Sequence, residues 1–435
     1  MTLQKNAGAV RRFAKAMKFG AWLQTIPNKF TPAPFRLVQI GAAYWQSRAL
    51  FVAARLDVAT VLGPESLSAT ELAGRVGANG DALGRLMRML AAMGIFEETG
   101  PRQFRNNRLS RRLRSGDPQS VRAMILMHNS EAMSRPWFEQ LEAGVRSGTP
   151  PFRLCHGEEL FDYLDHHADF DRLFSEATDS VEALAGDGFA TDLDWSRFDR
   201  IIDVGGSRGA KALAILKQYP RLSALIVDRP QVVEEAQRYW ANHSSDGVER
   251  LRFQAGDLLD AIPAATGPKD IYLLSAVLHD FDDGTCVRAL HKLRKAIGSS
   301  GARAAVLDMV VPETSADIAI ASVVMQMFVG CRGRERTLTE WRAVIQGTGM
   351  ALEEVVRLRS RDSILVLRSD WISFYAANRA SSPRHALPRG VASSVCQSVA
   401  SECERDSLPR PVTDGIGTSF REGRGCAHRA IDRRG

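Results

Sequence analysis

The sequence lacks the features of a membrane-spanning protein, of a protein stabilised by disulfides and of one that binds a metal through clustered Cys and His residues. No apolar run reaches the roughly 18 residues that a membrane span needs, so we expect no stable membrane insertion. The six cysteines form no Cys-x-x-Cys pair and have no histidine-rich cluster beside them, which predicts neither a metal site nor a disulfide framework. Unpaired cysteines fit a reducing compartment, and we therefore expect a cytoplasmic location.

Acidic residues are absent from the first 36 positions. The net charge of the chain is +7, and this segment holds seven basic side chains, so the rest is neutral overall. A net charge of zero over residues 37–435 is not typical of a DNA-binding protein, and we expect no nucleic-acid partner. Residues 1–34 form a basic arm with two open interpretations: a solvated, partly helical extension, or a helix for a membrane surface or for targeting. The membrane-surface or targeting interpretation rests on apolar residues that alternate with the basic ones, namely Val10, Phe13, Met17 and Trp22.

The chain is long enough for two or three domains, with 435 residues of which 45% are hydrophobic and 25% charged. Residues 35–117 predict a winged helix. One helix starts at Ser68 with Glu71 at capping-box spacing, a second starts at Asp81, and two short strands at 95–98 and 103–105 form the wing. The apolar spacing within residues 118–195 predicts further helices, which form a linker.

Strands and helices alternate along residues 196–369. Apolar strand cores lie at 201–204, 224–227, 271–274 and 304–307, and each precedes a segment of helical period. This alternation predicts an α/β domain whose parallel sheet carries helices on both faces, with an antiparallel pair near 351–357 and 363–367 at its edge. Residues 370–435 have no sustained apolar period, so we expect a disordered tail; a frameshifted end to the coding sequence is the alternative.

A glycine-rich turn follows the first strand of this domain. The run from Arg200 to Ala210 reads RIIDVGGSRGA, a strand that ends in glycines before a helix begins. Gly205 and Gly206 would let the backbone approach a ligand, as in mononucleotide-binding folds, and Gly209 would let the helix pack on the strand. The alternative is a tight turn that binds nothing.

Acids follow at the ends of the next two strands. Asp228 lies about twenty residues beyond the turn, where a carboxylate can accept both hydroxyls of a ribose. Asp257 and Leu258 end the third strand, where an acid and an apolar side chain could flank an adenine. His279 follows the fourth strand. It either caps the next helix or serves as a general base beside the cofactor pocket.

Taken together, these motifs resemble the S-adenosylmethionine-dependent O-methyltransferases of the plant phenolic, acetylserotonin and bacterial polyketide type. The resemblance covers roughly residues 35–369. It rests on the ordered segments 203–209 (DVGGSRG), 227–233 (VDRPQVV), 256–257 (GD), 278–283 (LHDFDD), 308–312 (DMVVP) and 333–337 (GRERT). It implies a Rossmann-like methyltransferase sheet with an N-terminal all-helical winged-helix dimerisation domain, and hence a homodimer.

The resemblance also implies roles for matching residues. The cofactor would be S-adenosylmethionine. The turn at Gly205, Gly206 and Ser207 would hold its methionine part, Asp228 its ribose, Asp257 with Leu258 its adenine, and Ser275 would assist. His279 matches the catalytic base, and Asp308 and Glu335 match the acids that orient it. Residues 118–195 would contribute to the substrate pocket, and Met127, Asn129 and Trp137 lie where its substrate contacts would be expected, although for Trp137 we favour packing in the helical core. No metal is implied, and the acceptor would be the hydroxyl of a small molecule.

Three positions depart from the family pattern. Ser207 replaces a glycine, Phe281 replaces a tryptophan, and Asp308 is shorter than the usual glutamate. Two other functions stay open for this chain. One is a winged-helix DNA-binding regulator that senses S-adenosylmethionine and uses Arg85 and Arg88 of its second helix. The other is a relative that binds the cofactor without transferring a methyl group.

Overall fold

The computed structural model describes residues 2–370, without the side chains of residues 28 and 181–185. The tail predicted at 370–435 therefore lies almost entirely outside the described residues. The chain begins with four helices: α1 (Ala7–Phe30), α2 (Ala33–Gly41), α3 (Ala43–Arg55) and α4 (Val58–Leu62). Across residues 2–370 no helix combines the length and the apolar character needed to cross a bilayer.

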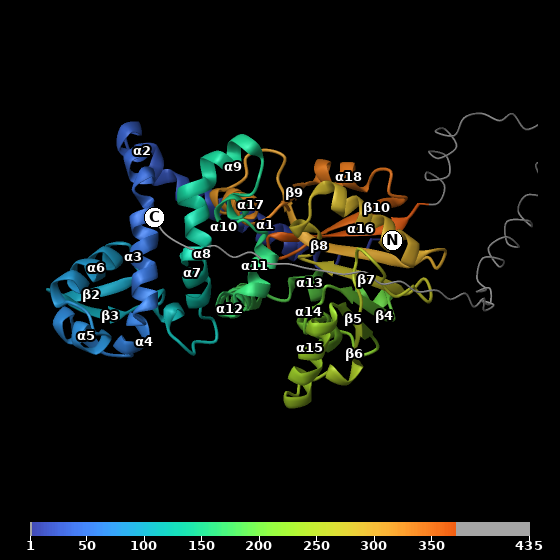
Figure 1. The fold of residues 1–435 in the computed structure, drawn as a ribbon, viewed down its shortest axis with the longest axis horizontal. Helices are drawn as coiled ribbons and strands as arrows, with labels where there is room; N and C mark the ends of the chain where they lie inside the picture. The colour runs from blue at the N-terminus through green and yellow to red at the C-terminus, as the bar shows by residue number, and fades with distance from the viewer. Residues whose placement is uncertain (1, 371–435) are drawn as a thin grey trace, which may run out of the picture. The chain divides into compact units, whose positions relative to one another are not determined.

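The winged-helix segment is built from two capped helices and a small sheet (Figure 1, blue). The capping box is confirmed: Ser68 accepts from the Glu71 N–H, and Glu71 bonds back to the Ser68 N–H at the start of α5 (Ala69–Val76). Helix α6 (Gly80–Ala92) begins one residue earlier than predicted, because Asn79 caps it instead of Asp81. The sheet has three strands in the order β1-β3-β2, where the sequence predicted two: β1 (Ser66–Ser68), β2 (Phe96–Gly100) and β3 (Gln103–Asn106).

A run of helices, most of them short, joins this segment to the second sheet. They are α7 (Arg122–His128), α8 (Glu131–Arg135), α9 (Leu141–Ser147), α10 (Pro151–His156), α11 (Leu160–His166), α12 (Ala168–Ala185) and α13 (Gly188–Asp192). Met127, Met133 and Phe152 belong to an apolar core that is shared by α7, α8, α10, α11 and α12. The sequence predicted helices throughout this stretch, and this is confirmed.

The second sheet follows the order β10-β11-β8-β7-β4-β5-β6, and a short β9 pairs with β8. Strands β4 to β8 pair in parallel, while β11 lies antiparallel to both β8 and β10. The mostly parallel Rossmann-like sheet with an antiparallel pair at its edge is thus confirmed. The strands are β4 (Arg200–Val204), β5 (Ser223–Asp228), β6 (Leu251–Ala255), β7 (Asp270–Ser275), β8 (Arg303–Val311), β9 (Arg336–Thr337), β10 (Met350–Arg357) and β11 (Asp362–Ser369).

Helices cover both faces of this sheet, as Figure 1 shows. On one face, α13 and α14 (Ala210–Gln218) pack on alternate strand residues such as Ile201 and Ile226. On the other, α16 (Asp283–Ile297) and α18 (Leu338–Ile345) pack on the intervening residues, such as Ile202 and Tyr272. The continuous apolar strands therefore reflect burial on both sides, which is the pattern of a parallel sheet.

The start of the basic arm is docked on the sheet domain rather than solvated. Residues 2–6, which we call the N-terminal clasp, place Leu3 in the core at 3% exposure. The Leu3 N–H donates to Glu354 Oε2 at 2.8 Å, and the Lys5 N–H donates to the Asp192 carbonyl at 2.7 Å. The predicted solvated, partly helical extension does follow, as α1, whereas residues 2–6 pack on the sheet domain and are not solvated as expected.

Candidate active site

The glycine-rich turn between β4 and α14 forms one wall of the site. Gly205 and Gly209 have positive φ values of 76° and 77°, and a Cβ at Gly206 would lie 2.6 Å from the Asp203 carboxyl carbon. Glycine is required at these points, because a side chain would strain or block the turn. Ser207 also has a positive φ of 51°, a conformation that L-residues adopt at a cost of roughly 1–2 kcal/mol.

Asp228 closes the turn from the neighbouring strand. Its Oδ2 accepts from the Ser207 N–H at 2.9 Å, and its Oδ1 accepts from the Arg229 N–H at 2.8 Å. Two backbone donors thus fix the carboxylate at the carboxyl end of β5, half-buried. Oxygens held in this way keep lone pairs for further donors, such as the hydroxyls of a ribose.

The other residues expected at the cofactor follow β6 and β7. Asp257 is exposed, and its Oδ1 accepts from the Leu259 N–H at 2.7 Å; Leu258 packs in the sheet core at 6% exposure. Ser275 ends β7 with a buried hydroxyl that has no hydrogen-bond partner among residues 2–370. A buried hydroxyl without a partner is costly, and a bound ligand would satisfy it. The turn, Asp228 and Ser275 therefore fit a nucleoside cofactor with a polar tail.

His279 lies just beyond β7, in the short 3-10 helix Leu278–Asp280. Its Nδ1 is 2.8 Å from Glu335 Oε1, and its Nε2 is 3.6 Å from Asp280 Oδ1. Burial alone would lower the pKa of the imidazole. The hydrogen bond to Glu335 and the charges of Asp308 and Asp280 outweigh burial and raise the pKa of His279 to about 9.

Asp308 lies in β8 and acts on the imidazole through charge only. It is 3% exposed, and neither carboxylate oxygen has a hydrogen-bond partner in the described chain. Burial raises the pKa of Asp308 to about 7 and the pKa of Asp280 to about 6. The resemblance assigns two acids to orienting the base, but only Glu335 makes a bond to it here. Asp280 was missed by sequence reasoning, although its place beside His279 was a usable signal.

The residues predicted to contact substrate lie among the linking helices. Met127 is part of their core at 4% exposure. Asn129 ends α7, and its side-chain oxygen accepts from Ser47 Oγ of α3 at 3.2 Å. Trp137 is only half-buried, and its indole N–H donates to Gln326 in α17 (Ile318–Gly330) at 3.0 Å. In the part of the chain that the structure describes, neither Met127 nor Asn129 is hydrogen-bonded to His279, so their substrate role stays a prediction.

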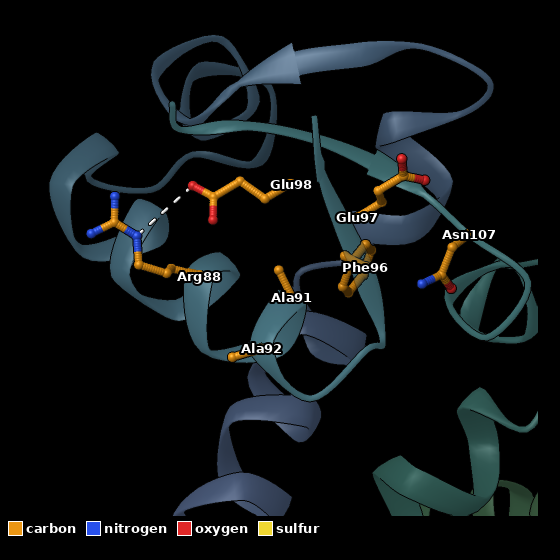
Figure 2. A pocket seen from close by; sticks show the side chains of 7 residues that line it. All are labelled: Arg88, Ala91, Ala92, Phe96, Glu97, Glu98 and Asn107. Atoms are coloured by element: carbon orange, nitrogen blue, oxygen red, sulfur yellow. Dashed lines mark ion pairs between the residues drawn. The ribbon is translucent and has the colours of Figure 1, made fainter. Parts of the chain in front are cut away.

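A separate hollow lies on the winged-helix segment, between α6 and β2 (Figure 2). Its volume is about 430 Å³, and none of the residues expected at the cofactor, the base or the substrate line it. Arg88, on its wall, is 3.8 Å from Glu98, and the nearby Arg85 is 2.9 Å from Asp81. The basic side chains that a DNA-reading helix would need are thus paired with acidic ones. Among residues 2–370, no group of three or more His, Cys, Asp or Glu residues is placed to hold a metal ion.

Comparisons with known proteins agree with this geometry. The O-methyltransferase domain family matches residues 138–351, and the O-methyltransferase dimerisation domain family matches residues 38–116. The phenazine O-methyltransferase PhzM of Lysobacter antibioticus is 32% identical over 333 residues, which cover 76% of this chain and 95% of that protein. The 3-amino-4-hydroxybenzoate 4-O-methyltransferase of Streptomyces cremeus is 30% identical over 329 residues, which cover 74% and 87%.

Solved structures give the same result. The crystal structure of LaPhzM superposes with a TM-score of 0.71 at 30% identity, covering 78% of this chain and all of that one. Human N-acetylserotonin methyltransferase in complex with S-adenosylmethionine superposes with a TM-score of 0.68 at 25% identity, covering 78% and 99%. With the turn, Asp228 and His279 brought to one edge of the sheet, the chain belongs to the S-adenosylmethionine-dependent O-methyltransferases of secondary metabolism and carries their dimerisation domain.

Proposed function

We propose that the protein moves the methyl group of S-adenosylmethionine to the hydroxyl of a small aromatic or polyketide-like molecule, with His279 as general base. The observation that carries the proposal is the 2.8 Å contact between His279 Nδ1 and buried Glu335, beside the strand ends that fit the cofactor. Relatives named for phenazine, aminohydroxybenzoate and mitomycin chemistry support a small cyclic acceptor.

The Glu335 carboxylate sets the tautomer of the base. When it accepts from Nδ1–H, the lone pair of the neutral imidazole lies on Nε2, which is then the atom that receives the hydroxyl proton. The raised pKa of His279 makes the neutral imidazole a stronger base, and the fraction in the neutral form increases as the pH rises toward about 9. The bound cofactor supplies an electrophilic sulfonium methyl group.

Cofactor binding is assigned to the strand ends. Gly205, Gly206 and Ser207 would hold the methionine part through the turn backbone. Asp228 would accept the ribose hydroxyls, and Asp257 and Leu258 would flank the adenine. The Ser275 hydroxyl would gain a hydrogen-bond partner that it lacks among residues 2–370. Aligning an acceptor hydroxyl with the methyl group supplies on the order of 7–11 kcal/mol of the barrier reduction in well-oriented reactions.

The homodimer is proposed on the exposed apolar surface of the first helices. Helix α2 has no buried residue. Large apolar side chains are exposed along α1 to α3, among them Phe30, Phe35, Leu37, Val38, Ile40 and Trp45. Exposed apolar side chains gathered on successive helices are typical of an interface, and some of them, such as Val38, Ile40 and Trp45, lie in the matched dimerisation domain.

The test of the function is His279→Gln, assayed with a labelled methyl donor on a panel of phenols that includes aminohydroxybenzoates. Turnover should fall by about 10²–10⁴-fold, the usual contribution of a positioned base. Binding of S-adenosylhomocysteine should be unchanged, and His291→Gln, at an exposed position on α16, is the control. An equally active His279→Gln variant would show that positioning alone drives transfer. Tight cofactor binding with no methylated product would favour the non-methylating relative.

A further inference from the structure

The segment from Gly333 to Thr337 holds the turn that carries His279 through contacts that the roles above do not use. Arg336 is fully buried. Its Nη1 donates to the Leu278 carbonyl at 3.1 Å, and its Nη2 donates to the Phe281 carbonyl at 2.7 Å. These two carbonyls lie on either side of His279 in the chain, so one guanidinium fixes the backbone on both sides of the base.

The guanidinium is itself held in one orientation. Its Nε donates to Asp283 Oδ1 at 2.9 Å, and its Cζ lies 5.2 Å from the centre of the Trp341 ring. A planar group with five donors can serve several acceptors at fixed angles, which an ammonium group cannot do. The buried charge is therefore paired and almost fully hydrogen-bonded, which is the condition for it to be stable in the interior.

Gly333 allows the segment to approach the turn closely. A Cβ at this position would lie 1.9 Å from the His279 carbonyl oxygen and 2.3 Å from the Asp280 carbonyl carbon. The φ of Gly333 is not in the left-handed region, so the requirement for glycine is steric and not conformational. Both neighbouring atoms are backbone, and neither can move aside without moving His279.

The segment rests on rigid elements. Strand β9 pairs in parallel with Val310 and Val311 of β8, two residues beyond Asp308. Thr337 begins α18 with a capping box to Glu340. Glu335 and Arg336 are consecutive in the chain. Glu335 bonds to the His279 side chain, and Arg336 bonds to the backbone on both sides of His279.

We propose that Arg336 and Gly333 are positioning residues for the base: together they hold the 278–281 backbone where His279 Nδ1 reaches Glu335. The inference rests on the proposed role of His279 in methyl transfer. A merely structural role for these residues would alter stability but would leave the imidazole of the folded molecule in place. The geometry instead predicts that the imidazole itself is displaced.

The experiment uses the full chain with Gly333→Ala and Arg336→Lys. The controls are Gly74→Ala, where a Cβ meets nothing within 4 Å, and Arg303→Lys, which alters an ion pair with Glu353. The first readout is the proton NMR signal of the hydrogen-bonded Nδ1–H, assigned by its absence from His279→Gln. The others are thermal melting, calorimetric binding of S-adenosylhomocysteine, and kcat on the phenol panel.

Both test variants should lose or shift the Nδ1–H signal, while the controls keep it. The kcat should fall roughly 100-fold, as expected for a misplacement of about 1 Å, with the affinity for S-adenosylhomocysteine unchanged. Folded variants that keep both the signal and kcat would overturn the proposal, as would activity lost only in proportion to the unfolded fraction. If Gly333→Ala does not fold, Arg336→Lys decides. The NMR readout needs no acceptor, so it stays decisive even if His279→Gln proves fully active.

Discussion

Replacing Glu335 with Gln should lower the pKa of His279 strongly. In the folded protein burial disfavours the imidazolium, and the hydrogen bond to Glu335 is the largest effect that opposes burial, bringing the pKa to about 9. An opposite charge at hydrogen-bond distance changes a pKa by roughly 1–3 units, so the midpoint should fall to roughly 6–8. Glutamine has nearly the same shape, and the substitution removes the charge with little change in packing.

The assay is a pH titration of the His279 imidazole by NMR, with Glu353→Gln at the sheet edge as the matched control. Glu353 pairs with Arg303, far along the sheet from the base, and its loss should leave the midpoint unchanged. A Glu335→Gln midpoint indistinguishable from that of the wild type would refute the reasoning. It would mean that Asp308 and Asp280 alone keep the imidazole charged.

The same substitution has a consequence for stability. The pKa of His279 is raised above its ordinary 6.5, so its stabilising contribution is fully present below pH 6.5 and is lost as the pH rises through about 9. The difference in the free energy of unfolding between wild type and Glu335→Gln should therefore narrow across this window. Urea unfolding at a series of pH values measures it.

Three further changes have expected outcomes. Asp228→Ala should weaken binding of S-adenosylhomocysteine by roughly 1.5–3 kcal/mol in calorimetry, since charge-assisted hydrogen bonds are lost; an unchanged Kd would remove this residue from the site. Ser207→Gly should stabilise the fold by roughly 0.5–1 kcal/mol in urea unfolding, because it relieves the positive φ, and a destabilised variant would show that the serine is not strained. Deleting residues 2–6 should cost roughly 2–4 kcal/mol, because buried Leu3 and a hydrogen bond to Asp192 are lost; unchanged melting would show that the clasp contributes nothing.

The sheet domain could be predicted because local patterns determine it. Apolar strand cores followed by helical periods place consecutive strand ends on one edge, and this argument alone put Asp228 and His279 at the same edge of the sheet. The capping box at Ser68 is likewise encoded within four residues. The third winged-helix strand was missed because three residues are too few to show alternation.

The contacts of the base could not be derived from spacing. Glu335 lies 56 residues beyond His279, and only the family resemblance paired them. Among residues 2–370 no group, His279 included, is hydrogen-bonded to the Asp308 carboxylate. Such a contact depends on the length of the side chain, which no periodicity describes. The docking of Leu3 could not be predicted either, because its hydrogen-bond partner Glu354 lies 351 residues further along the chain.

The clasp also changes what the edge of the large sheet offers to other molecules. Strand β10 is an outer strand, and the N–H and carbonyl of Arg357 point away from its neighbour β11. The Gln4 side-chain amide bonds to both groups, at 2.8 Å and 3.0 Å, much as a further strand would. Unpaired strand edges are templates for association between chains. A molecule that loses the clasp would therefore expose this end of β10 and become more prone to aggregate through its sheet.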